Sequence, residues 1–420
     1  MRVDVAVVGG GASGLMAALC AARAGAGRVI VLERLNRVGK KLMATGNGRC
    51  NLTNVNLRDA DYHGGAYQAQ NVLAAYPPER VMRFFELIGV QPHVEETGRV
   101  YPLSDQASSV LDALRLALQE AGGEEIVDFE LRKIVPDGRD FLLCAADRRE
   151  VRASRVIMAT GGVTAPNLGG SESGLNVLRD LGHAVERPFP ALVQIKTETE
   201  SIRALKGIRF TGRATIEVDQ VNLRSEEGEI LFTEYGLSGI PILQLSRIAY
   251  EAMMNSQAAY IGLSVLTCSV YEAERLLLER RENLQARTLE NFLTGLVNKR
   301  LGQTLIKEAL KLNGGNTAPG FFDRPVRTLT EREISLFASF LTGWWLQITG
   351  AMGFDQAQVT MGGVRGGEFH PDTLESARVP GLYLTGELID IDGDSGGFNL
   401  QWAWASGMAA GAACAESLRG

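Results

Sequence analysis

The chain has few of the residues from which disulfide frameworks, metal sites and membrane spans are built. Five cysteines and four histidines are scattered over 420 residues, and no two cysteines stand in a CxxC pair. This spacing argues against a disulfide framework, and we expect no metal site. No apolar run reaches the roughly 20 residues that a membrane-spanning helix needs, so we expect no membrane partner.

An excess of positive charge is also missing. The chain has 43 Lys and Arg residues against 49 Asp and Glu residues, which gives a formal net charge of −6. Such a protein has no general attraction for nucleic acid, so any RNA contact depends on a local basic patch. The N-terminus runs straight into the apolar segment 3–8, without the basic region and cleavage site of a signal peptide, and we expect a cytoplasmic protein.

What the sequence does contain is a βαβ pattern at its start. Residues 3–8 form an apolar run that ends in glycines, residues 14–25 have helical spacing, and residues 29–32 form a second short apolar run. Continuous apolar strands are typical of a parallel sheet covered on both faces. Residues 380–418 return to this pattern. We therefore predict an α/β fold with a Rossmann-like nucleotide-binding domain built from both chain ends.

The middle of the chain has a different character. Residues 191–246 contain strand-like segments with turn residues, whereas residues 270–312 and 329–346 are charged and amphipathic. We expect a nucleotide-binding domain of residues 1–190 plus 347–420. It is interrupted by a β-rich insertion of residues 191–268 and a helical insertion of residues 269–346.

The first turn carries a dinucleotide-binding fingerprint, GGGASG, at residues 9–14. In such a motif Gly9 permits the tight turn, Gly11 lets the backbone approach a pyrophosphate, and Gly14 lets the helix pack closely on the strand. The helix N-terminus then binds the phosphate charge. Glu33 lies 19 residues beyond Gly14, where a carboxylate accepts the ribose hydroxyls.

Motifs near the C-terminus favour FAD over NAD, because a flavin extends past the first βα unit. Thr385-Gly386-Glu387 ends a late strand and places a carboxylate where a ribityl hydroxyl can donate to it. The string GGFNLQ, residues 396–401, opens the last helix. The positive end of that helix would stabilise a reduced flavin by about 0.3–2 kcal/mol. Residues 157–162, IMATGG, fit the strand and turn that complete an FAD domain.

Two long strings resemble the BaiN/RdsA-type (YhiN-like) family of flavoproteins. They are KKLMATGNGRCNLTN at residues 40–54 and GELIDIDG at residues 386–393, continuing through GFNLQWAW at residues 397–404. The resemblance runs over essentially the whole chain. It implies a glutathione-reductase-like FAD domain with a β-barrel-like and a helical insertion. Together with the fingerprints it implies that non-covalent FAD contacts Gly9, Gly11, Ala12, Ser13, Gly14, Glu33, Arg34, Lys41, Asn47, Gly48, Arg49, Cys50, Asn51, Leu131, Ala159, Thr160, Gly161, Gly386, Glu387, Gly397, Asn399 and Leu400.

The resemblance implies reductive or oxidative chemistry on one of several substrates. We expect an FAD-dependent oxidoreductase in which NAD(P)H, bound transiently, drives reduction of an activated C=C bond. The specific hypothesis is reduction of uridine to dihydrouridine in large-subunit ribosomal RNA. Two alternatives stay open: an oxidase or reductase of a small amine or a steroid-like enone, and a flavin-bound interaction protein without turnover.

Several residues have two interpretations. Cys50 is a candidate proton donor, but packing beside the cofactor is the favoured interpretation. Trp402 and Trp404 are expected to pack rather than to stack on bases. The TMGGV string at residues 360–364 resembles the Gly-Gly turn of fumarate reductases, but Gln358 and Val359 stand where those enzymes have a substrate-binding histidine. We therefore expect no dicarboxylate chemistry.

Two basic clusters are candidate RNA contacts. One consists of Arg203, Lys206, Arg209 and Arg213 in the β-rich insertion. The other consists of Arg275, Arg280, Arg281, Arg287, Lys299, Arg300, Lys307 and Lys311 in the helical insertion. Glutamates interleave the helical cluster, so a solvated face of ion pairs is the favoured interpretation there.

Overall fold

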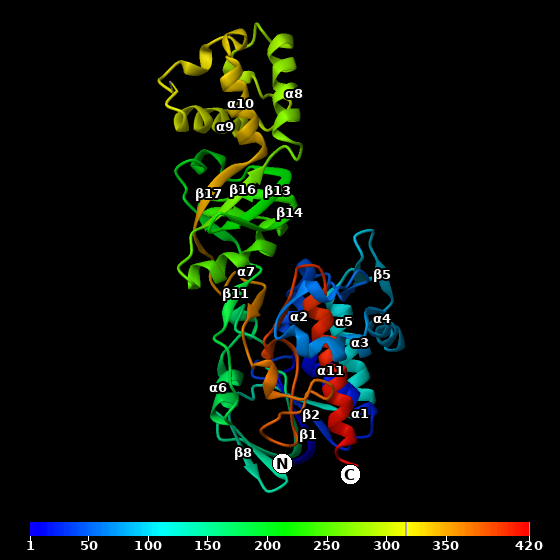
Figure 1. Ribbon diagram of the computed structural model, residues 1–420. Helices are drawn as coiled ribbons and strands as arrows, with labels where there is room; N and C mark the ends of the chain where they lie inside the picture. The colour runs from blue at the N-terminus through cyan, green and yellow to red at the C-terminus, as the bar shows by residue number, and fades with distance from the viewer. Residues whose placement is uncertain (316, 420) are drawn as a thin grey trace. The chain divides into compact units, whose positions relative to one another are not determined.

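The chain forms two compact units in the computed structural model, which describes residues 1–315 and 317–419 (Figure 1). Unit 1 contains Met1–Pro190 and the chain from Ala357 onward, and unit 2 is Ala191–Gln356. Both chain ends thus build unit 1, and the predicted Rossmann-type α/β fold is confirmed. Unit 1 resumes at residue 357 rather than at the expected 347, because β17 (Trp344–Ala351) is a strand of unit 2.

A seven-stranded sheet forms the centre of unit 1, with the order β7-β2-β1-β10-β9-β8 and with β19 beside β10. Its strands are β1 (Arg2–Val8), β2 (Val29–Leu32), β7 (Glu124–Ile126), β8 (Leu131–Asp137), β9 (Asp140–Ala145), β10 (Glu150–Met158) and β19 (Leu382–Leu384). β10 is parallel to both β1 and β19. The carboxyl ends of these three strands therefore meet at one edge of the sheet, where ligands bind in open α/β sheets.

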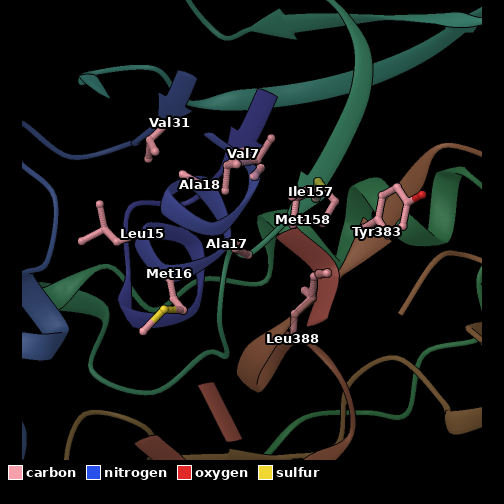
Figure 2. Close-up of a cluster of buried hydrophobic side chains, with 14 of the residues drawn as sticks. Val7, Leu15, Met16, Ala17, Ala18, Val31, Ile157, Met158, Tyr383 and Leu388 are labelled. Carbon is pink, nitrogen blue, oxygen red and sulfur yellow. The ribbon is translucent and has the colours of Figure 1, made fainter. Parts of the chain in front are cut away.

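The helices of unit 1 are α1 (Ala12–Arg23), α2 (Lys40–Ala44), α3 (Gln70–Ala75), α4 (Pro78–Leu87), α5 (Ala107–Glu120), α6 (Ser173–Asp180) and α11 (Phe398–Glu416). Figure 2 shows Val7 of β1, Leu15 of α1 and Met158 of β10 in one buried cluster. From Val5 to Val8, β1 is wholly apolar and buried because helices cover this part of the sheet.

Short strands complete unit 1. They are β3 (Thr53–Asn54), β5 (Pro92–Val94) and β6 (Arg99–Pro102) in one sheet, β4 (Tyr62–Gly64) with β20 (Ile391–Gly393), and β11 (Phe189–Ala191) with β18 (Val359–Met361). The β4–β20 pair joins an early segment to the segment that leads into α11.

Unit 2 is a closed barrel with helices. The barrel order is β12-β15-β14-β13-β16-β17, and β12 closes it by pairing with β17, with Ile195 opposite Ala351. The other elements are β12 (Ile195–Thr197), β13 (Arg209–Val218), β14 (Val221–Phe232), β15 (Gly236–Ser238), β16 (Ala259–Ser264), α7 (Ile240–Met254), α8 (Val270–Asn283), α9 (Lys299–Leu312) and α10 (Glu331–Thr342). In neither unit do the described residues include a helix of the length and hydropathy that a membrane crossing demands.

Close packing of α1 on α11 yields a prediction about stability. A Cβ built on Gly411 would lie 2.4 Å from the backbone oxygen of Ala17, which is shorter than any normal contact. We expect Gly411→Ala to lower the free energy of unfolding by about 1–3 kcal/mol, because the helices must move apart. Gly367→Ala is the matched control, since no atom lies within 4 Å of its built Cβ. Urea unfolding of both variants measures the effect, and equal midpoints would contradict it.

Candidate active site

The glycine-rich turn between β1 and α1 is shaped by close backbone contacts. Gly9 has φ +108°, and a Cβ built there would lie 2.3 Å from the backbone oxygen of Ala159. A Cβ on Gly14 would lie 1.9 Å from the oxygen of Gly9. Gly11 differs, because no atom lies within 4 Å of its built Cβ, and no side chain caps the helix there. The first N–H groups of α1, at Ala12 and Ser13, are thus available to a phosphate.

Glu33 follows β2 and binds the same turn. Its Oε2 accepts a hydrogen bond from the Gly10 N–H at 2.8 Å, and its Oε1 accepts one from the Leu35 N–H at 2.8 Å. The backbone oxygen of Glu33 accepts from the Phe129 N–H, so the segment that leads to Leu131 runs past this carboxylate. Each carboxylate oxygen has a second lone pair for a ribose hydroxyl. The neighbouring Arg34 donates to the Gly169 oxygen at 3.0 Å.

The ends of β10 and β19 bring two more expected segments together. The Thr385 N–H donates to the Met158 oxygen, so Thr160 and Gly386 follow neighbouring strands at the same edge. A Cβ on Gly386 would lie 2.5 Å from the Ser13 Oγ, which places this turn against α1. The Thr160 Oγ1 is buried and has no hydrogen-bond partner among the described residues.

Glu387 and Lys41, two of the predicted cofactor-binding residues, form an ion pair with each other. The Lys41 Nζ donates to the Glu387 Oε2 at 2.7 Å and to the Thr164 Oγ1 at 2.8 Å. The Glu387 Oε1 accepts from the Thr360 N–H at 2.7 Å and from the Thr164 Oγ1 at 3.3 Å. Three protein donors thus hold the Glu387 carboxylate and fix the turn, and a further lone pair is left for the ribityl hydroxyl that the sequence predicts as its donor.

Thr164 and Thr360 were not identified from the sequence as site residues. The Thr360 Oγ1 also accepts from the N–H groups of Val163 and Thr164, at 2.8 and 3.2 Å. The sequence does contain a pattern that points to Thr360, because this residue opens the TMGGV string that resembles the Gly-Gly turn of fumarate reductases. The contact partners lie almost 200 residues away.

The loop of residues 45–51 has an unusual backbone. Gly46, Asn47 and Cys50 have φ values of +56°, +55° and +61°, in the left-handed region that glycine and asparagine tolerate best. Asn47 and Gly48 are exposed, whereas the side chain of Cys50 is fully buried. Burial raises the pKa of the Cys50 thiol to about 12, with a hydrogen bond involving Thr45 acting in the opposite direction. Cys50 is thus a neutral, packed thiol at physiological pH.

Arg49 is engaged by the protein itself. Its guanidinium lies 3.9 Å above the Tyr101 ring and donates to Glu95 at 2.8 Å and to Asp105 at 2.6 Å. The side chain of Arg49 therefore has two carboxylates and an aromatic ring as partners, and the cofactor contact that the resemblance implies for this residue stays a prediction. Arg49 fixes the loop to β6 and its neighbours, since both acids lie far from it in sequence.

The turn before α11 meets the same loop. A Cβ on Gly397, which has φ +109°, would lie 2.5 Å from the Thr53 oxygen and 3.0 Å from the Asn51 Oδ1. The Asn51 Oδ1 is buried and lacks a hydrogen-bond partner among the described residues. The Asn399 side chain holds the turn, because its Oδ1 accepts from the Gly393 N–H and its Nδ2 donates to the Gly393 oxygen. Leu400, next to it, is half-buried.

The expected packing role of the two tryptophans is confirmed. Trp402 and Trp404 are buried in α11. The Trp402 Nε1 donates to the Gly386 oxygen at 3.0 Å, and the Trp404 Nε1 donates to the Leu52 oxygen at 2.9 Å. Each indole therefore holds one site segment against the helix.

These features fit a flavin dinucleotide. The open space at Gly11 suits a pyrophosphate beside α1. Two buried polar atoms of this edge, the Thr160 Oγ1 and the Asn51 Oδ1, lack partners in the described part of the chain, and a buried polar atom without a partner costs about 1–3 kcal/mol. A polar ligand along this edge would satisfy both atoms.

Comparison with known proteins agrees with this geometry. The model of the HI0933-like protein Rossmann domain matches residues 3–413. A 3-dehydro-bile acid delta(4,6)-reductase from Clostridium scindens is 35% identical, covering 98% of this chain and 99% of the relative. A ribosomal RNA dihydrouridine synthase from Escherichia coli is 29% identical, covering 99% and 98%.

A solved structure shows a likeness of fold alone. It is the 3-ketosteroid delta1-dehydrogenase from Sterolibacterium denitrificans in complex with 1,4-androstadiene-3,17-dione. It is 13% identical with a TM-score of 0.50, covering 99% of this chain and 100% of that chain.

The chain is an enzyme of the FAD-dependent oxidoreductase class, as its fold and its relatives agree. It belongs to the HI0933-like family.

The burial of Cys50 leads to a prediction about thiol reactivity. Because its pKa is raised to about 12 and its side chain is buried, we expect no alkylation of Cys50 by iodoacetamide in the folded protein at pH 8. Cys268 is exposed and is the internal control, which should react under the same conditions. Peptide mass spectrometry after alkylation distinguishes the two sites. Rapid labelling of Cys50 would show that it is an accessible thiolate.

Proposed function

We propose that this enzyme binds FAD non-covalently along the edge described above and reduces a C=C bond that is conjugated to a carbonyl group. Two buried polar atoms at this edge, the Thr160 Oγ1 and the Asn51 Oδ1, have no partner among the described residues, and they carry the cofactor proposal. The reaction class rests on the relatives. A delta(4,6)-reductase of 3-dehydro-bile acids and a dihydrouridine synthase both saturate a C=C bond next to a carbonyl.

In this proposal each part of FAD has its own protein segment. The N–H groups of Gly11, Ala12 and Ser13 bind the pyrophosphate, and Glu33 accepts the hydroxyls of the adenosine ribose. The backbone at Leu131 borders the adenine. The segments 159–161, 386–387, 47–51 and 397–400 surround the ribityl chain and the flavin. FAD supplies hydride transfer when bound, and we propose NAD(P)H as the transient electron donor.

For the substrate we propose uridine in large-subunit ribosomal RNA as the first candidate. Two relatives support it, the Escherichia coli enzyme and a ribosomal RNA dihydrouridine synthase from Haemophilus influenzae that is 26% identical. An RNA substrate requires phosphate contacts from local basic residues, because the net charge is negative.

A small enone is the second candidate, and two observations favour it. The bile acid reductase is 35% identical over nearly the whole chain. The basic cluster on the barrel is also largely neutralised: Lys206 pairs with Glu234 at 2.5 Å, Arg209 with Glu229 at 2.5 Å, and Arg213 with Glu227 at 2.7 Å. In the helical part, Lys299 and Lys311 likewise pair with glutamates. The alternative of an interaction protein without turnover does not fit an enzyme family.

Replacement of Glu33 tests the cofactor proposal. We expect Glu33→Ala to lower the FAD content of the purified protein, because the ribose loses its acceptor and the Gly10 N–H loses its own. Glu124→Ala, which removes an exposed carboxylate from β7, should retain FAD. The flavin absorbance relative to protein, with heat release of the cofactor, measures both. A protein that binds NAD but no FAD would disprove the proposal.

Salt dependence separates the two substrate candidates. If RNA binds through the barrel cluster, binding of a large-subunit ribosomal RNA fragment should weaken with salt, with a log–log slope of about −0.7 per phosphate contacted on a single strand. Replacing Arg203, Lys206, Arg209 and Arg213 by Gln should flatten that slope while FAD content stays constant. Turnover of a 3-oxo-4-ene steroid by wild-type protein without salt-sensitive RNA binding would instead select the enone.

A further inference from the structure

The turn that opens α11 has a cation beside it. Arg99 is the first residue of β6 and stands opposite Asn54 in the β3–β6 pair. A Cβ built on Gly396 would lie 3.8 Å from the Arg99 Nε and 3.5 Å from the Asn54 Nδ2. Asn54 also donates to the Gly396 oxygen at 3.0 Å. The half-buried Arg99 side chain therefore lies against the glycine turn at the N-terminus of α11.

Arg99 differs from the other arginines of these segments in its partners. Arg49 pairs with Glu95 and Asp105, and Arg58 pairs with Asp61 at 2.6 Å. In the part of the chain that the structure describes, no carboxylate lies within ion-pair distance of Arg99 and its guanidinium donates no hydrogen bond. The half-buried guanidinium of Arg99 is therefore available to a ligand. Its planar set of N–H donors suits a carboxylate or a phosphate.

Two further features lie beside Arg99, at the turn that opens α11. α11 is a helix of 19 residues whose N-cap, Gly397, has no capping side chain, so its positive end adds to the positive potential around Arg99. The buried Asn51 Oδ1, which the proposed function assigns to FAD, lies 3.0 Å from a Cβ built on Gly397. A group held by Arg99 would therefore lie beside the flavin.

We propose that Arg99 binds an anionic group, a carboxylate or a phosphate, of the substrate. This inference rests on the proposed function, in which the pyrophosphate of FAD binds at α1. The pyrophosphate binds at α1 and the N-terminus of α11 faces the flavin, so the guanidinium of Arg99, a separate cation beside that turn, is left for the substrate. The enzyme then selects conjugated carbonyl compounds that carry a negative charge away from the reacting bond.

Two pairs of probes test this, each with a charged and a neutral member. The carboxylate pair is a 3-oxo-4-ene bile acid and its methyl ester, and the phosphate pair is uridine 5′-monophosphate and uridine. Binding to the oxidised FAD-loaded protein is followed by the change in flavin absorbance, which needs no turnover. For wild-type protein we expect the charged member of one pair to bind more tightly than its neutral partner, and that pair identifies the group.

The matched variants are Arg99→Gln, Arg99→Lys and Arg83→Gln. Arg83 is an exposed residue of α4 that pairs with Glu86, so its replacement makes the same charge change elsewhere. Arg99→Gln should weaken binding of the charged member by about 10- to 100-fold and leave the neutral member unchanged. The affinity of Arg99→Lys for the charged member should lie between those of wild type and Arg99→Gln, because lysine keeps the charge but lacks the planar guanidinium. Arg83→Gln should match wild type.

The outcomes separate this inference from the proposed function. Equal losses for charged and neutral members would mean that Arg99 shapes the site without binding an anion. No preference for either charged member in wild-type protein would also overturn the inference, while flavin-dependent reduction of a neutral probe would leave the proposed function standing. Absence of FAD from wild-type protein would refute the proposed function and this inference together.

Discussion

The parallel pairing of β10 with both β1 and β19 is the constraint on which the site depends. These strands come from residues 2–8, 150–158 and 382–384, and their carboxyl ends share one edge of the sheet. The glycine turn, the segment after Met158 and the turn at Gly386 consequently become neighbours. The backbone bond from Thr385 to Met158 and the contact of Gly386 with Ser13 are direct results of this pairing.

Local sequence patterns predict the first βα unit, but they do not predict the side-chain contacts between distant segments at the carboxyl edge of the sheet. The roles of Gly9 and Gly14 follow from spacing alone, because a tight turn and a close helix need glycine at fixed positions. Glu33 follows from its distance to that turn. By contrast, the ion pair of Lys41 with Glu387 joins residues 346 positions apart, and no local pattern specifies it.

Charged side chains at the edge illustrate why residue identity alone does not give residue role. Arg49 lies in a string that resembles a cofactor loop, yet its carboxylate partners come from positions 95 and 105. Arg99 lies outside the motifs of the cofactor site, yet its guanidinium has no such partner in the described chain. Partners decide whether a cation holds the protein together or remains available to a ligand, and partners become known only with the fold.

The closure of the barrel between β12 and β17 has a consequence for how the two units can evolve. The first and last strands of unit 2 are hydrogen-bonded neighbours, with Ile195 opposite Ala351. The polypeptide therefore enters and leaves this unit at nearly the same point, as in a domain that has been inserted into a host. Such a unit can be lengthened, exchanged or removed during evolution without altering the strand order of the host sheet. The sheet edge and the barrel are thus free to diverge at different rates.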